Sequence, residues 1–289
     1  MNIIRTLKNS PIFQQKAKDP LDFKITFAVC TNRGMDAQAV KKFITAGNCV
    51  KPKITLRMKI DDSLIDRARS VVASEFLRSD SDVLMFIDDD IVYDPMDVIK
   101  LGMRVKCQDY DIIGGAYLTK TTRSPFFVFR ELGSKKPITF IKQVHNPETD
   151  PVEVENISTG FMAMSRRAVQ AVADQVPECH KDDPSIQPFW PMFQPFPEET
   201  ANGWVYKSED WAFCTRARNA GMKVWIDPSI KLGHIGRYTY SWEDFELSKM
   251  REQLGSVDSL IYNNLPSGCE PGGGTTHGAN NNKEVKNNG

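Results

Sequence analysis

The feature that most constrains the fold is a run of five apolar residues, Val83–Ile87, which ends in three consecutive aspartates, Asp88, Asp89 and Asp90. A short, continuous apolar run is typical of a strand that is buried on both faces, as in a parallel sheet. Open α/β sheets bind ligands at the carboxyl edge, where such strands end. Because side chains alternate along a strand, we expect Asp88 and Asp90 to point the same way and Asp89 the opposite way.

The aspartates indicate a metal site. Two carboxylates that converge at a sheet edge repel each other unless a cation lies between them. The alternative interpretation is a polar loop in which Asp94 caps a helix that starts at Pro95. That interpretation accounts for Asp94 and leaves the three aspartates unexplained. We therefore favour a metal site formed by Asp88 and Asp90.

Length and composition limit the classes of protein to consider. The 289 residues are enough for one large α/β domain or two small ones. With 37 basic and 37 acidic residues, the net charge favours neither nucleic acid nor an anionic membrane. The six cysteines include no C-x-x-C pair, which indicates reduced thiols. No run approaches the ~20 apolar residues of a membrane span, and the amino terminus lacks the apolar stretch of a signal peptide. We expect a soluble, cytoplasmic protein with no transmembrane segment.

Strand and helix patterns alternate in the first part of the chain. Expected strands cover residues 23–31, 52–60, 83–87 and 111–117, and expected helices cover 35–46, 64–76 and 95–106. This order predicts an α/β fold in which parallel strands are joined by right-handed crossovers.

The pattern changes after Lys120. Strands are expected at 125–143, 152–157, 161–165 and 223–227, and helices at 166–173, 208–220 and 241–254. Residues 177–197 contain six prolines and are predicted to form a lid or binding loop. We divide the chain into an N-terminal extension (1–22), one catalytic domain (23–262) and a disordered Gly- and Asn-rich tail (263–289).

Four short motifs give the chain a family resemblance. They are Asp88-Asp89-Asp90, Thr159-Gly160-Phe161-Met162, Ser208-Glu209-Asp210 and Leu232-Gly233-His234. Each alone is too short to be specific. In this order, over residues 23–240, they resemble a glycosyltransferase of the GT-A fold, most closely the small family-2-like members of bacteria and phages. The resemblance implies a Rossmann-like, mostly parallel central sheet with flanking helices and a smaller mixed portion on the acceptor side.

The resemblance also implies an activity. It predicts a metal-dependent enzyme that moves a sugar from a nucleotide diphosphate sugar to an acceptor hydroxyl. The donor is expected to be UDP-linked by family frequency, and the reaction is expected to invert the anomeric centre. The acceptor stays open between a glycan, a lipid-linked sugar, a protein side chain and a modified base of phage DNA.

The metal ligands implied by the resemblance are Asp88, Asp90 and His234, with Mn²⁺ or Mg²⁺ as the ion. A cation offsets the charge that the diphosphate leaving group gains. Oxygen ligands suit both ions, and an imidazole favours manganese. His234 lies between two glycines after an expected core strand. The alternative for His234 is a histidine that is hydrogen-bonded in a tight turn.

Glu209 and Asp210 are the catalytic candidates. In inverting family-2-like enzymes the aspartate of this pair is the general base for the acceptor hydroxyl, which implies that role for Asp210 and an orienting role for Glu209. The alternative is an acidic pair in the first turn of a helix, where the helix dipole favours it.

Six residues are expected to bind the nucleotide sugar. Thr31 and Arg33 follow the first strand and resemble the family's base-contacting segment, and Asp62 follows the second strand. The resemblance implies that Arg69, on the next helix, faces the nucleotide, and guanidinium pairs bidentately with phosphate; the alternative for Arg69 is a solvated helix face. Asp88 and Asp89 complete this set.

Aromatic and glycine residues are candidates for the acceptor side. Phe189, Trp190 and Phe193 can form a platform for a sugar or base, and the alternative is packing of the loop against the domain. Gly114 and Gly160 would let the backbone approach a ligand closely, or they belong to turns.

Two rival functions remain. A haloacid-dehalogenase-type phosphatase would use Asp88 as nucleophile and Asp90 as general acid with magnesium, and Lys207 with Asp210 keeps this alternative open. Its motif normally lies on the first strand, whereas two strands precede it here. The second rival is a nucleotide-sugar-binding module without turnover.

Overall fold

The computed structural model describes residues 19–31, 37–48, 51–60, 62–120, 129–132, 150–180, 187–201, 203–236 and 239–244. The chain divides into two compact units, Met1–Ser248 and Lys249–Gly289, and all described residues belong to the first unit. The predicted tail at 263–289 and residues 1–18 of the predicted extension lie outside the described residues.

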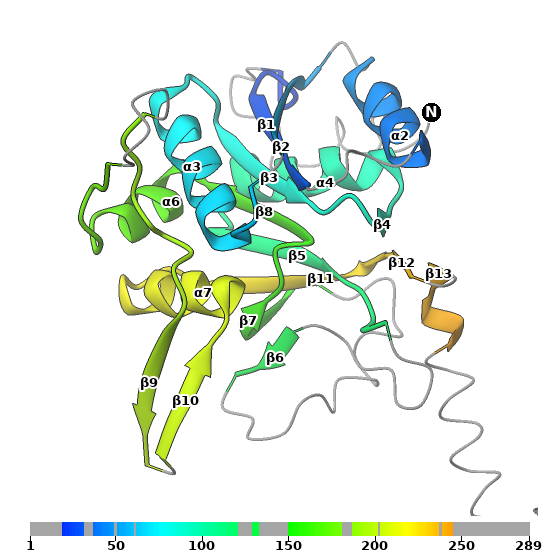
Figure 1. The fold of residues 1–289 in the computed structure, drawn as a ribbon. Coiled ribbons are helices and arrows are strands. Elements are labelled where there is room, and N and C mark those ends of the chain that lie inside the picture. Colours follow the sequence, from blue (N-terminus) through cyan, green and yellow to red (C-terminus); the bar gives the residue numbers. More distant parts are fainter. Residues whose placement is uncertain are drawn as a thin grey trace, which may run out of the picture. The chain divides into compact units, whose positions relative to one another are not determined.

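The core is an eight-stranded sheet with the strand order β2-β1-β3-β8-β5-β11-β7-β6 (Figure 1). The strands are β1 (Lys24–Thr31), β2 (Lys53–Ile60), β3 (Val83–Ile87), β5 (Ile112–Ala116), β6 (Phe129–Glu131), β7 (Val152–Ile157), β8 (Phe161–Ser165) and β11 (Val224–Lys231). Only β8 and β7 run against the direction of the other strands of this sheet. The predicted α/β class with a mostly parallel central sheet is therefore confirmed.

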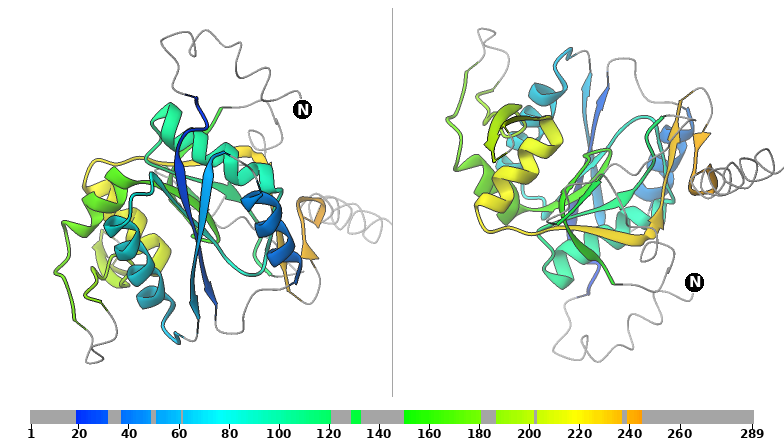
Figure 2. Two further views of the ribbon diagram at one scale, coloured as in Figure 1. Left: turned by 90° about the horizontal axis from the view of Figure 1, so that it is seen from above. Right: turned by 90° about the horizontal axis from the view of Figure 1, so that it is seen from below.

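Helices lie on both faces of the sheet (Figure 2). They are α2 (Ala37–Gly47), α3 (Ile65–Arg78), α4 (Pro95–Gln108), α6 (Arg166–Ala173) and α7 (Glu209–Asn219). Leu84 and Phe86 of β3 belong to the apolar cluster that includes α3, α6 and α7, whereas its other three residues belong to the cluster that includes α4. All five residues of β3 are buried, as the apolar run predicts.

Two smaller sheets complete the described part. One has the order β13-β12-β4, with β4 (Ile91–Val92), β12 (Gly233–Ile235) and β13 (Thr239–Tyr240). The other is a hairpin of β9 (Phe196–Thr200) and β10 (Gly203–Lys207), which extends away from the large sheet (Figure 1). The pairing of β12 with β4 places His234 opposite Ile91, directly after the three aspartates.

The segment 177–197, predicted to form a lid or binding loop, packs against the domain over much of its described part. The backbones of Cys179 and Phe189 pair with each other, and residues from Phe196 onward begin β9. Met192 and Phe193 are fully buried in the core. The apolar side chains of this segment bury against the domain, which keeps it packed despite its prolines. In the described residues, no helix has the length and apolar character needed to cross a membrane.

Candidate functional site

The three aspartates after β3 reach different partners. Continuing the alternation of β3, Asp88 extends toward α3 and α7, and Asp89 extends toward the end of β1. Asp90 lies beside the small sheet, where its backbone carbonyl accepts a hydrogen bond from Ile235 N at 2.8 Å. The side-chain partners are Arg69 for Asp88, Thr31 for Asp89, and Lys120 with His234 for Asp90.

A buried arginine joins Asp88 to Glu209. Arg69 lies on α3 and donates from Nη2 to both oxygens of Asp88, at 2.9 and 3.2 Å, and from Nη1 to Glu209 Oε1 at 2.8 Å. Its side chain is 5% exposed. Burial lowers the pKa of Arg69, but the carboxylates of Asp88 and Glu209 outweigh burial, so the net pKa is raised. The guanidinium therefore remains charged and ties α3, β3 and α7 together at the carboxyl edge.

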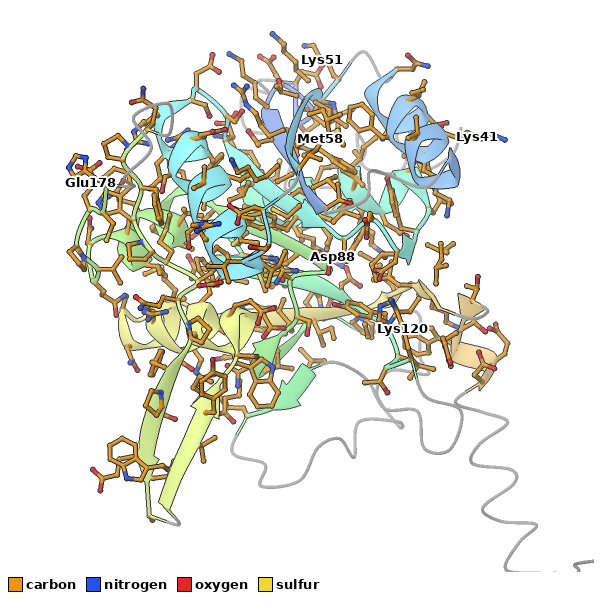
Figure 3. The ribbon with its side chains drawn as sticks, in the orientation of Figure 1. Lys41, Lys51, Met58, Asp88, Lys120 and Glu178 are labelled. Carbon is orange, nitrogen blue, oxygen red and sulfur yellow. The ribbon has the colours of Figure 1, made fainter. Side chains whose placement is uncertain are left out.

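Asp90 faces one histidine nitrogen and one ammonium. His234 Nδ1 lies 2.7 Å from Leu118 O, and because a carbonyl only accepts, we assign the ring proton to Nδ1. Nε2 then faces Asp90 Oδ1 at 3.6 Å, and Lys120 Nζ pairs with Oδ2. Burial raises the pKa of Asp90, and His234 and Lys120 lower it further than burial raises it. Lys120 and Asp88 both lie near the carboxyl edge of the large sheet (Figure 3).

Asp90 and His234 partly fit a divalent cation. A proton on Nε2 is what lets His234 lower the pKa of Asp90; without that proton Nε2 presents a lone pair to a carboxylate oxygen, and a metal cation is then the group that can bridge the two acceptors. Magnesium-type sites use one or two protein groups together with waters and substrate phosphates. Within the described ranges, no group of three His, Cys, Asp or Glu side chains is placed to hold a metal ion. The set of Asp88, Asp90 and His234 stays a prediction, of which the structure brings Asp90 and His234 together.

Asp210 lies at the first turn of α7 and is 9% exposed. Its Oδ1 accepts hydrogen bonds from Ser208 Oγ at 2.5 Å and from Trp211 N at 2.8 Å. Tyr117 shows which carboxylates are near: burial raises the pKa of Tyr117, and the charges of Asp88 and Asp210 raise it further. Asp88 and Asp210 therefore share the surroundings of one buried phenol. The catalytic roles of Asp210 and Glu209 stay predictions.

The predicted nucleotide residues have separate environments. Thr31 ends β1 and donates to Asp89, so these two lie together. Asp62 pairs bidentately with Arg67, with a shortest distance of 2.6 Å, and its side chain is 5% exposed. Burial raises the pKa of Asp62, but its hydrogen bonds from Arg67 and from the backbone lower it overall. Arg33 lies outside the described residues.

Packing accounts for the glycines that were candidates for ligand contact. A Cβ on Gly160 would lie 2.3 Å from Tyr117 Oη, and one on Gly114 would lie 2.6 Å from Phe161 O. No side chain fits at such distances, so both positions need glycine whether or not a ligand binds. Gly160 O also accepts a hydrogen bond from Asp88 N at 3.1 Å, which fixes the start of the aspartate segment.

The predicted aromatic platform is mostly packed inside the domain. Phe193 stacks on Phe213 with ring centroids 4.5 Å apart, and Phe189 is 9% exposed. Trp190 packs against the core and lies beside the guanidinium of Arg78. The packing alternative therefore holds for Phe189 and Phe193.

The most exposed aromatic residues among those described were missed by the sequence analysis. Trp204 and Tyr206, both on β10, are each 69% exposed. A signal for this hairpin was present, because Asn202-Gly203 is a strong hairpin dipeptide and the aromatic and β-branched residues Trp204-Val205-Tyr206, which favour strands, follow it. Lys120 and Tyr117, which contact or adjoin the aspartates, had no motif that could reveal them.

Comparisons with known proteins bear on the fold alone. Neither a scan against models of known protein families nor a search of curated proteins finds a match. Among solved structures, A197 from STIV matches with probability 1.00, a TM-score of 0.46 and 19% identity, over 74% of this chain and 86% of that chain. GalNAc-T7 with UDP, GalNAc and Mn²⁺ matches with a TM-score of 0.42 and 12% identity, over 76% of this chain and 45% of that chain.

A third match is CMP:2-keto-3-deoxy-manno-octonic acid synthetase complexed with CTP. It has a TM-score of 0.35 and 13% identity, over 70% of this chain and 88% of that chain. The fold class itself follows from the strand order given above.

Proposed function

We propose that this protein is a metal-dependent glycosyltransferase that moves a sugar from a nucleotide diphosphate sugar, UDP-linked and with inversion, to an acceptor hydroxyl. The observation that carries the proposal is the pair of Asp90 and His234, which meet at the carboxyl edge of the central sheet from distant parts of the chain. Ligands of open α/β sheets bind at this edge.

In the proposed site, one set of residues would bind the nucleotide-sugar donor and another set would act on the acceptor hydroxyl. Asp90 and His234 are the residues that would hold Mn²⁺ or Mg²⁺, and a bound cation would offset the charge on the diphosphate leaving group. Asp88 pairs with the buried guanidinium of Arg69 at the end of β3, and Thr31 with Asp89 lies at the end of β1. Arg33 and Asp62 are further candidates for contact with the nucleotide.

Asp210 is the proposed general base. Its Oδ1 is held by Ser208 and by the backbone of Trp211, which fixes the orientation of the carboxylate at the start of α7. The second oxygen is then left to accept a proton from an acceptor hydroxyl. Glu209, held by Arg69, is the positioning residue beside it.

The phosphatase alternative has little support in this geometry. It would require a lysine near Asp88, and Lys207 instead pairs with Glu198 at 2.9 Å with its side chain 4% exposed. The variant Asp210→Asn distinguishes an enzyme from a nucleotide-sugar-binding module without turnover. An enzyme is expected to keep metal-dependent donor binding in this variant and to lose turnover by roughly 10²–10⁴-fold.

The first experiment is thermal unfolding with UDP, GDP, CDP and ADP, each with and without Mn²⁺. A ligand that binds only the folded state at a hundredfold excess over Kd stabilises it by about 2.7 kcal/mol. The proposal expects a large shift with one nucleotide, dependent on Mn²⁺ and lost in Asp90→Ala. Metal-dependent phosphate release from a generic phosphate ester, with no nucleotide shift, would contradict it.

A further inference from the structure

The hairpin of β9 and β10 has two chemically different faces. Trp204 pairs with Glu199, and Tyr206 pairs with Pro197, so these four residues share one face, and all four are exposed. The other face packs inward. There Phe196 lies under the guanidinium of Arg216, at 4.7 Å from ring centroid to Cζ, and Lys207 pairs with Glu198.

The exposed face carries two aromatic side chains in a row. Trp204 and Tyr206 are each 69% exposed, more than any other described aromatic residue. Residues i and i+2 of a strand are about 7 Å apart on the same side, which is the scale of neighbouring rings in a sugar chain. Aromatic faces stack on the apolar C–H faces of sugar rings, and the indole N–H and phenol O–H supply polar contacts at the edge.

The charge of this face narrows the class of ligand. The only basic residue of the segment 196–207 is Lys207, which is buried and paired, and the exposed face presents the carboxylate of Glu199. Nucleic acid and anionic lipid surfaces need exposed cations, so both are disfavoured. A carboxylate beside aromatic rings instead suits a neutral polyhydroxylated chain, because it accepts hydrogen bonds from hydroxyls.

The hairpin also leads directly into the proposed catalytic residues. Only Ser208 separates the end of β10 from α7, whose first two residues are Glu209 and Asp210. Trp204 and Ser208 are four residues apart, or about 13 Å along an extended strand. A chain stacked on Trp204 and Tyr206 can therefore point one end toward Asp210.

We propose that the exposed face of the β9–β10 hairpin, formed by Trp204, Tyr206 and Glu199, binds the neutral oligosaccharide chain of a glycan acceptor. This inference rests on the proposed glycosyltransferase function and names the acceptor class that the sequence left open. Trp204 and Tyr206 act as specificity-determining residues for the acceptor and take no part in donor binding.

The test measures saccharide binding without any nucleotide. The full-length protein is applied to an array of immobilised neutral oligosaccharides, and the strongest binder is then titrated by calorimetry. We expect W204A/Y206A to weaken binding at least tenfold. W204F/Y206F keeps two aromatic faces and is expected to retain most of the affinity. Ile60→Ala, which removes an exposed apolar side chain from β2, is the matched control and is expected to bind as the wild type does.

The outcomes separate this inference from the proposed function. No binding to any neutral oligosaccharide, or equal binding by W204A/Y206A, overturns the inference. So does a change from dimer to monomer in W204A/Y206A, since the face would then serve a second copy of the chain. The Mn²⁺-dependent nucleotide shift is measured in the same variants and is expected to be unchanged. Absence of this nucleotide shift in the wild type would contradict the proposed function. The saccharide titration would still test whether the hairpin binds oligosaccharide.

Discussion

At the scale of single residues, the site depends on the buried guanidinium of Arg69. Replacing it with alanine leaves Asp88 and Glu209 without their shared cation in a partly buried place. Breaking a buried ion pair in this way costs about 3–5 kcal/mol. We expect Arg69→Ala to lower the free energy of unfolding by that amount in urea denaturation.

Arg78, at the end of the same helix, provides the control. Its side chain is 37% exposed, and its partner Glu178 is 43% exposed, so Arg78→Ala leaves no buried carboxylate without a partner. An ion pair this exposed is worth about 1 kcal/mol or less. Equal losses for Arg78→Ala and Arg69→Ala would show that the Arg69 bridge has no special role in stability.

Lys120 competes with a metal ion for Asp90. Its ammonium pairs with Oδ2 while His234 faces Oδ1, so a divalent cation must share or displace that charge. In Lys120→Met, which keeps most of the stem, we expect Mn²⁺ to bind up to about tenfold more tightly without nucleotide, since tenfold corresponds to 1.4 kcal/mol. Calorimetric titration of Mn²⁺ measures this.

Lys223→Met is the comparison for that measurement. Lys223 also forms an ion pair, with Glu153 at 3.1 Å, but its side chain is 57% exposed and Glu153 is not a predicted metal ligand. We expect no change in Mn²⁺ affinity. If Lys120→Met is equally without effect, the ammonium and the cation do not share Asp90.

At the scale of elements, the start of α4 contains a carboxyl group that makes stability depend on pH. Asp94 caps the helix, and Asp97 Oδ2 accepts from Asp94 N at 3.3 Å. Burial raises the pKa of Asp97, and the charges of Asp94 and Asp227 add to this, so that it is about 6. An unfolded aspartate has a pKa of about 3.9.

The raised pKa sets the direction of the pH effect. Below about pH 4, Asp97 is protonated in both states and contributes no difference. Between about pH 4 and 6 the unfolded state ionises first, so the free energy of unfolding falls, by about 1–3 kcal/mol in total. Asp97→Asn keeps an acceptor for Asp94 N and removes the titration. Its stability relative to the wild type should rise across this window in urea denaturation, and a constant difference would contradict the assignment.

Sequence patterns predicted the long and buried elements well. The strands at 152–157 and 161–165 and the helix at 166–173 have the bounds that were expected, because each combines an apolar pattern with a clear cap or turn. The strands β4, β12 and β13 were missed. They have two or three residues, which is too short for any periodicity, and only their pairing with each other defines them.

The candidate site was predictable only where a motif marks it. The aspartates and His234 could be named from the sequence, and the structure brings Asp90 and His234 together. The pairing of Asp88 with Arg69 could not be predicted, because it depends on how α3 packs, which no local pattern records. The packing of residues 177–197 against the domain could not be predicted, because proline content does not show whether aromatic side chains are buried.

At the scale of the whole molecule, the topology assembles the site from distant segments. Asp90, Lys120 and His234 come from three parts of the chain, and Arg69 and Glu209 from two more, yet all lie where strands of the large sheet end. Such contacts can form only once the sheet is in register, because one shifted residue turns every side chain to the other face. The site is therefore a property of the complete sheet.

Amide hydrogen exchange can show whether the large sheet and the β9–β10 hairpin differ in stability. β3 and β8 pair on both sides and are buried by helices on both faces, so their amides should exchange only through global unfolding. The β9–β10 hairpin has two strands and mostly exposed residues, and an isolated two-stranded hairpin is marginally stable in water. We expect its amides to exchange through local opening, at a free energy well below that of β3.

W204A/Y206A should leave the protection of β3 and β8 unchanged, because neither side chain contributes to the core clusters. Protection of the hairpin equal to that of β3 would mean that the hairpin opens only when the whole sheet does.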